Sequence, residues 1–212
     1  MSDIFREIDD ELRRENLLQL WSRYSRYIIA AAVLLALIVG GTFAWRQYLA
    51  SERLAQANRY SAALALARQD KDQEAATLFA TLANGGGYGI PAGFQEAALL
   101  AKAGDRQGAI AAYDRLAASA TVGREYRDLA VLFSVMHQLP DGDPQAAIQR
   151  LAPLTETGNP WHATALDVTA AAKLKAGDRG GALEIYQTLA DDLAAPRALR
   201  ARAAEMAAAL KS

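Results

Sequence analysis

A sixteen-residue segment occurs twice in this 212-residue chain, and this repetition constrains the fold more than any other feature. Residues 102–117 read KAGDRQGAIAAYDRLA and residues 175–190 read KAGDRGGALEIYQTLA, with 10 of 16 positions identical at a separation of 73 residues. Because 73 is about twice a period in the mid-thirties, another unit is expected between the two copies. Residues 142–154, GDPQAAIQRLAPL, supply that unit, and a weaker copy begins at Asp70.

Four units follow from this comparison, and each carries an alanine at the same position. The four alanines are Ala75, Ala109, Ala147 and Ala182. Their spacings of 34, 38 and 35 residues match the period of the tetratricopeptide repeat, with a short insertion in the third unit. Each unit is expected to form two helices joined by a turn. A Gly-Asp pair supplies the left-handed residue that ends the first helix and the aspartate that begins the second.

Small residues are also expected on the first helices, where they cross the second helices closely. Counting back twelve residues from three of the alanines gives Ala63, Ala97 and Ala170. After the fourth unit, Pro196 precedes a stretch with helical periodicity over residues 198–210, which predicts an extra helix covering the last face of the solenoid. The chain contains 48 Ala but only 15 Val or Ile, so an extended sheet is not expected. The predicted fold class is all-α: an N-terminal transmembrane helix, about four helix-turn-helix units and a capping helix.

Residues 27–45, YIIAAAVLLALIVGGTFAW, contain no charged residue and predict the transmembrane helix. Nineteen helical residues cover about 28 Å, close to the roughly 30 Å hydrocarbon core of a bilayer. Trp21 and Trp45 flank the stretch, as aromatic residues do at membrane interfaces. A buried core helix and a cleaved signal peptide are the alternatives. A signal peptide agrees less well, because 26 residues precede the apolar run and the run is longer than signal peptides use.

The arginines near this stretch predict its orientation. Five arginines precede it and three follow it closely: Arg6, Arg13, Arg14, Arg23 and Arg26, then Arg46, Arg53 and Arg59. This bias places the N-terminus inside and the C-terminal domain outside the cytoplasm. Residues 1–26 carry apolar residues at helical spacing and predict an amphipathic cytoplasmic leader, which either binds a partner or lies against the membrane surface. The predicted domains are therefore 1–26, 27–45 and 46–212.

Several classes of function are not expected from this composition. The 23 Lys+Arg and 24 Asp+Glu leave no basic excess for binding nucleic acid. The absence of Cys excludes disulfides and thiolate chemistry, and His137 and His162 have no metal-site spacing. The glycine run at 85–89 lacks the Lys-Ser/Thr of a phosphate loop. We therefore expect no enzyme, no cofactor, no metal site and no small-molecule substrate.

Partner binding is expected on the concave surface, which the first helices of a repeat array line. The residues predicted to bind a protein partner are Tyr60, Leu64, Arg68, Phe94, Lys102, Asp167 and Lys175. Their mixture of apolar, aromatic and cationic side chains suits an extended peptide or a helix better than a free carboxylate. In the alternative interpretation, the next repeat or self-association buries several of them.

The order of these features resembles bacterial inner-membrane proteins with one N-terminal anchor and a tetratricopeptide-repeat-like periplasmic domain. The ancillary subunit of the SecYEG translocon typifies that family. The similarity rests on the charged leader and on four segments: FAWRQY at 43–48, GGGYG at 85–89, TGNPW at 157–161 and PRALRAR at 196–202. It implies a single-pass inner-membrane protein that contacts the SecYEG translocon and periplasmic chaperones. The alternative is an accessory structural subunit of another inner-membrane complex, held mainly through its transmembrane helix.

Overall fold

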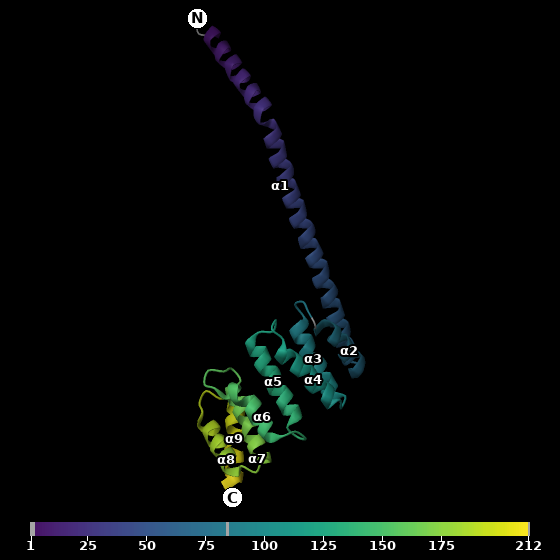
Figure 1. Ribbon diagram of the computed structural model, residues 1–212, viewed down its shortest axis with the longest axis vertical. Coiled ribbons are helices and arrows are strands. Elements are labelled where there is room, and N and C mark those ends of the chain that lie inside the picture. The colour runs from purple at the N-terminus through teal and green to yellow at the C-terminus, as the bar shows by residue number, and fades with distance from the viewer. Residues whose placement is uncertain (1–2, 84, 212) are drawn as a thin grey trace. The chain divides into compact units, whose positions relative to one another are not determined.

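The computed structural model describes residues 3–83 and 85–211, with side chains from residue 25 onward except residues 28 and 32. All regular elements of this described part are helical (Figure 1). They are α1 (Asp3–Ala67), α2 (Asp72–Ala83), α3 (Gly89–Lys102), α4 (Arg106–Ala118), α5 (Arg124–Gln138), α6 (Pro144–Leu151), the 3-10 helix η1 (Ala152–Thr155), α7 (His162–Lys175), α8 (Arg179–Asp191) and α9 (Arg197–Lys211). The chain divides into two compact units, residues 1–54 and 55–212.

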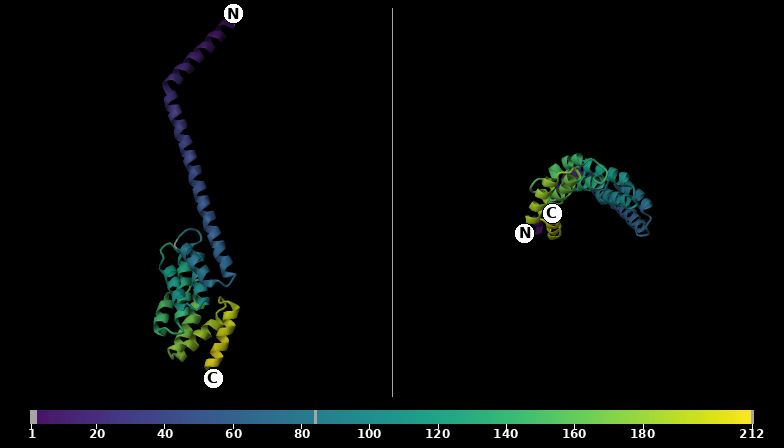
Figure 2. Two further views of the ribbon diagram at one scale, coloured as in Figure 1. Left: turned by 90° about the vertical axis from the view of Figure 1, so that its right-hand side faces the viewer. Right: turned by 90° about the horizontal axis from the view of Figure 1, so that it is seen from below.

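The second unit is a solenoid of helix pairs, which confirms the predicted fold class. The end of α1 packs with α2, and the pairs α3–α4, α5–α6 and α7–α8 follow, each in contact with the next (Figure 1). Viewed from below, these helices follow a curved arc (Figure 2). The last helix, α9, packs on α8, where Ala203, Met206 and Leu210 join its apolar cluster. The extra helix expected after Pro196 is therefore present.

Small buried residues hold the helix pairs together at the predicted positions. The four alanines of the second helices and the three alanines of the first helices are all buried, six of the seven with no exposed surface at all. Large side chains next to them fill the space between units, as Phe79, Tyr113 and Tyr186 do. Alanine permits two helix backbones to approach closely, so the positions of these residues fix the repeat register.

Two of the Gly-Asp turns take the expected form. Gly104 and Gly177 have left-handed φ values of 85° and 84°. The aspartate that follows each glycine begins the next helix, with its carboxylate accepting the backbone N–H of Gly108 in one unit and of Gly181 in the other. These contacts are the capping that the sequence predicts.

The third turn differs, and the expectation of a left-handed glycine is wrong there. Gly142 has no positive φ, because the chain already turns through residues 139–141 before it. Glycine is still required, since a Cβ at this position would lie 2.8 Å from the carbonyl oxygen of Gln138. Asp143 nevertheless begins α6, with its carboxylate accepting the N–H groups of Gln145 and Ala146.

The part of α1 over Ser25–Ala67 contains one stretch long and apolar enough to cross a membrane. None of its most apolar window is buried. Leu37 and Phe43 are 68% and 71% exposed. A core helix of a soluble domain would be mostly covered, so this exposure disfavours the buried-helix alternative. The backbone of the leader is helical from Asp3, but its amphipathic face lies outside the described side chains and stays a prediction.

Candidate partner-binding site

The seven predicted residues lie on three first helices of the solenoid or directly after one of them: α1, α3 and α7. Tyr60 is half-buried, with its ring centroid 5.2 Å from that of Phe79 and 5.1 Å from that of Tyr88. Leu64 packs partly buried against the same cluster. Since Tyr88 immediately precedes α3, the ring of Tyr60 contacts both the first unit and the second.

Phe94 forms a second aromatic contact between units. Its ring lies 6.0 Å from Tyr113 of the same unit and 6.2 Å from Phe133 on α5. Tyr113 in turn stacks on His137, with the rings 5.7 Å apart. Burial raises the pKa of the Tyr113 hydroxyl above its ordinary value. Phe94 is therefore a packing residue with only part of its ring available to a partner.

Lys102 is exposed, but its ammonium group is already engaged. Its Nζ lies 3.0 Å from a carboxylate oxygen of Asp70 and 3.0 Å from one of Asp72. The hydrogen bonds to Asp72 and then to Asp70 raise the pKa of Lys102 above its usual range. Lys102 thus joins the second unit to the turn of the first.

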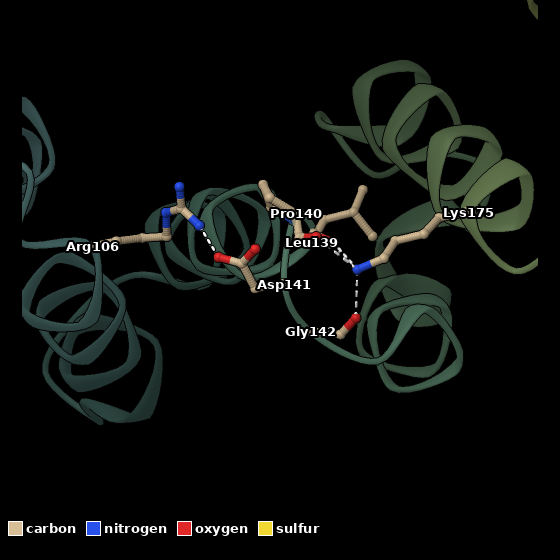
Figure 3. Close-up of polar contacts among 6 residues, drawn as sticks. All are labelled: Arg106, Leu139, Pro140, Asp141, Gly142 and Lys175. Atoms are coloured by element: carbon tan, nitrogen blue, oxygen red, sulfur yellow. Dashed lines mark hydrogen bonds and ion pairs between the residues drawn. The ribbon is translucent and has the colours of Figure 1, made fainter.

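Lys175 occupies the equivalent position in the fourth unit and contacts the turn of the third (Figure 3). Its Nζ donates to the carbonyl oxygens of Leu139, Pro140 and Gly142 at 2.6, 2.9 and 2.7 Å. Arg106, at the start of α4, pairs with Asp141 of the same turn from the other side (Figure 3). The turn that carries the insertion is therefore held by cations from both neighbouring units.

Replacing Lys175 with Met should lower the free energy of unfolding by about 0.5–1.5 kcal/mol, because the three carbonyl groups lose their shared donor but remain accessible to water. Urea unfolding followed by circular dichroism measures the change. Lys71→Met is the matched control, since Lys71 is exposed and the described contacts give its ammonium group no partner. Equal stabilities of the two variants would contradict a stabilising role for Lys175.

Asp167 is buried, at 4% exposed, and pairs with Arg202 on α9. Its second oxygen, Oδ1, is buried and accepts no hydrogen bond from any residue that the structure describes. Burial raises the pKa of Asp167, and the charge and hydrogen bond of Arg202 partly counteract that rise. In this structure the carboxylate of Asp167 is directed to the capping helix.

Arg68 is the exception among the four charged residues of the set. Within the described part of the chain its guanidinium has no hydrogen bond or ion pair. Among the described residues, no hydrogen bond, ion pair or ring contact joins two of the seven predicted residues. They form a lining of separate positions, not one cluster.

Polar contacts between units were missed from the sequence, although their spacing is regular. Asp114 accepts hydrogen bonds from Ser134 and Arg150, and Arg150 lies 36 residues further along the chain. Asp167 and Arg202 are 35 residues apart. Residues of opposite charge one repeat period apart in the sequence could have predicted these contacts. In the described part of the chain no group of three or more His, Asp or Glu is placed to hold a metal ion.

Comparison with known proteins agrees with this architecture. A family model described as the tetratricopeptide repeat-like domain matches residues 19–207. The chain belongs to the tetratricopeptide repeat-like domain family. A crystal structure of a putative kinesin light chain with nearly identical TPR-like repeats, from Podospora anserina, is similar with a TM-score of 0.55. The two chains are 17% identical, and the similarity covers 72% of this chain and 83% of the other.

A search of curated proteins gives no match. The structural similarity concerns the fold alone, but the family assignment carries a general function. Tetratricopeptide repeat-like domains are scaffolds that bind other proteins, and their concave surfaces are the usual binding sites. This protein is thus a repeat scaffold of the protein-interaction class.

Proposed function

We propose that this tetratricopeptide repeat-like protein is a membrane-anchored interaction module of the bacterial inner membrane. Residues 1–26 lie in the cytoplasm, residues 27–45 span the membrane, and residues 46–212 form the periplasmic repeat domain. The main support is the composition of α1, because this helix contains both an apolar stretch with no buried part and the first helix of the first repeat. An exposed apolar surface of this length requires a bilayer or a partner to cover it.

Its role is that of an accessory subunit that links a translocation or envelope-assembly machine to periplasmic partners. The SecYEG translocon and periplasmic chaperones are the partners that the family resemblance implies. The order of the anchor, the repeats and the connecting segments supports this assignment. The chemistry of single residues does not distinguish one such machine from another.

The concave surface is proposed to bind the periplasmic partner. Arg68 supplies a guanidinium that no described residue pairs, Leu64 supplies half-buried apolar surface, and Ala98 is exposed between Phe94 and Lys102 on α3. Aromatic and arginine side chains are the types that most often dominate interface energies. The surface combines both types with a small residue that leaves room for a partner.

Substituting Ala98 with Glu should weaken partner binding at least about tenfold, because the added charged side chain would occupy the concave surface and lose hydration on binding. The full-length protein is purified in mild detergent, and co-purifying proteins are quantified by mass spectrometry. Ala111→Glu is the matched control, since Ala111 is exposed on α4, the second helix of the same unit. If both variants retain the same partners, the concave surface is not the binding site.

The proposed topology predicts that external protease degrades residues 46–212 in spheroplasts and leaves them intact in inside-out vesicles. This result follows from the larger number of arginines before the apolar stretch than after it. Antibodies against an epitope tag at the C-terminus provide the measurement. The reverse pattern of protection would show that the topology is inverted.

The structural-subunit alternative is tested by replacing residues 27–45 with an unrelated transmembrane segment. An interaction module should keep its periplasmic partners after this exchange, because its repeats carry the binding surface. If the exchange releases every partner while Ala98→Glu releases none, the transmembrane helix makes the main contact.

A further inference from the structure

A cavity of about 380 Å³ lies between α3, α4 and the loops that precede and follow this helix pair. None of the seven concave residues lines it, as far as the structure describes them. Four glycines contribute to its wall, at positions 85, 86, 89 and 93. Glycine is needed at Gly93, because a Cβ there would approach the Leu116 side chain to 2.8 Å. At Gly86 the side chain of Gln56 likewise takes the place of a Cβ, whereas a Cβ at Gly85 would meet nothing within 4 Å, so the wall is open to an entering group at Gly85.

Glu96 lies in the wall of this cavity and is only 5% exposed. Its Oε1 accepts a hydrogen bond of 2.5 Å from the guanidinium of Arg115, whereas its Oε2 is buried and has no hydrogen-bond partner among the described residues. A buried carboxylate oxygen without a donor has lost its hydration with no hydrogen bond in return, so it favours any donor that can reach it. The terminal torsion of a glutamate is soft, so the carboxyl can turn Oε2 toward a donor that enters the cavity.

The charges around Glu96 determine which donor fits. Arg115 already pairs with the carboxylate, so a second cation beside Glu96 would be repelled by the guanidinium. The remaining wall includes Ile90, Leu116 and Val122, which are apolar and mostly buried. A neutral group with an apolar body and a single N–H or O–H donor matches both features.

We propose that this cavity binds a tryptophan or tyrosine side chain of a polypeptide partner, with the indole N–H or phenol O–H donating to Glu96. These side chains combine large apolar surface with one polar donor, and they anchor many protein interfaces by filling pockets. The volume lies within the range of cavities that hold small organic groups. None of the seven predicted concave residues lines the site, so each proposal can fail without the other.

The chain contains no cysteine, so one introduced thiol can report on occupancy without background. Thr121 is exposed at the cavity wall, and its hydroxyl contacts only that of Ser119 among the described polar groups. Thr121→Cys is prepared in the full-length chain in lipid nanodiscs, and its rate of reaction with a soluble disulfide reagent is measured. The probes are N-acetyl-tryptophanamide and its N1-methyl analogue, which lacks the indole donor.

N-acetyl-tryptophanamide should slow the reaction of the thiol, and the N1-methyl analogue should require about tenfold higher concentration for the same protection. Glu96→Gln should remove this difference, because the amide keeps an oxygen for Arg115 but presents an NH₂ group to the probe. Asp167→Asn is the matched control, since Asp167 is also a buried acid with an arginine partner and with an oxygen that no described residue pairs, and it does not line the cavity. That control should retain the full difference.

Three results would overturn the proposal. The first is no protection by N-acetyl-tryptophanamide up to its solubility limit. The second is equal protection by the two probes in the Thr121→Cys protein. The third is an unchanged preference in the Glu96→Gln variant whose circular dichroism spectrum and melting behaviour match those of the parent protein.

Discussion

Replacing Ala109 with Trp should lower the Tm of the repeat domain by about 2–12 °C, since overpacking a core costs about 1–3 kcal/mol and each kcal/mol shifts a domain of this size by about 2–4 °C. Ala109 has no exposed surface and lies on α4, which packs between α3 and α5. A tryptophan there would separate helices that an alanine allows to touch. Thermal melting of the full-length protein, followed by circular dichroism at 222 nm, measures the effect.

The control for this substitution is Ala111→Trp on the same helix. Ala111 is exposed, so the added indole extends into solvent and the Tm should stay within about 2 °C of the wild-type value, as for most surface substitutions. If Ala109→Trp and Ala111→Trp have the same Tm, the register that places Ala109 at a helix crossing is wrong. Ala182→Trp offers an independent repetition of the test in the fourth unit, where the alanine is equally buried.

Replacing Arg202 with Met should destabilise the protein by about 1–3 kcal/mol near neutral pH, because it leaves the buried charge of Asp167 without a partner. Removing one partner of a fully buried ion pair destabilises a protein more than this. The smaller effect is expected here because the side chain of Arg202 is 59% exposed and water screens the pair. Methionine keeps most of the aliphatic length of arginine, so the change mainly removes charge. Urea unfolding at several pH values provides the measurement.

The effect of this substitution should depend on pH in a defined direction. Burial already raises the folded-state pKa of Asp167 above the ordinary 3.8, and loss of Arg202 removes the two interactions that hold it down. The folded state of the variant then binds the proton more tightly than the unfolded state does. The contribution of Asp167 to stability is therefore highest below pH 3.8 and is lost as the pH rises from that value through the raised folded-state pKa.

Because other carboxylates act in the opposite direction, the difference between variant and wild type is the informative quantity. Asp178 is one of them: hydrogen bonds from Lys173 and from the backbone of Gly181 lower its pKa, so its contribution is lost on acidification. Both proteins share that loss. Asp167→Asn combined with Arg202→Met should show no pH-dependent difference from Asp167→Asn alone. A destabilisation by Arg202→Met that is equal at pH 4 and pH 7 would contradict the assigned role of the buried charge.

The repeat register could be predicted from the sequence because it depends on residue size. An alanine at a helix crossing is required by geometry, and Ala75, Ala109 and Ala182 could be aligned without knowing what they contact. The turn at Gly142 could not be predicted in the same way. The insertion before it changes the path of the chain, and the left-handed glycine of the other turns becomes unnecessary.

The candidate site was less predictable. The repeat pattern predicts which residues face the groove, but it does not predict whether their side chains are already paired within the protein. The positions of Lys102, Asp167 and Lys175 follow from the repeat period, but the partners of these side chains depend on residues about one unit away. Only a comparison of charges at that distance would have paired Asp167 with Arg202 in advance. Glu96 and its cavity gave no sequence signal, since its partner Arg115 lies 19 residues away on the adjacent helix.

The contacts of Lys102 and Lys175 have a consequence for how such an array can evolve. The two lysines belong to the segments that are most alike in the chain, yet one binds two carboxylates and the other binds three carbonyl groups of an enlarged turn. The contact between this lysine and the turn of the preceding unit therefore differs from one pair of units to the next. Duplicating or exchanging whole units would conserve every helix but place these lysines against turns that do not match them. The order of the repeats is therefore constrained during evolution.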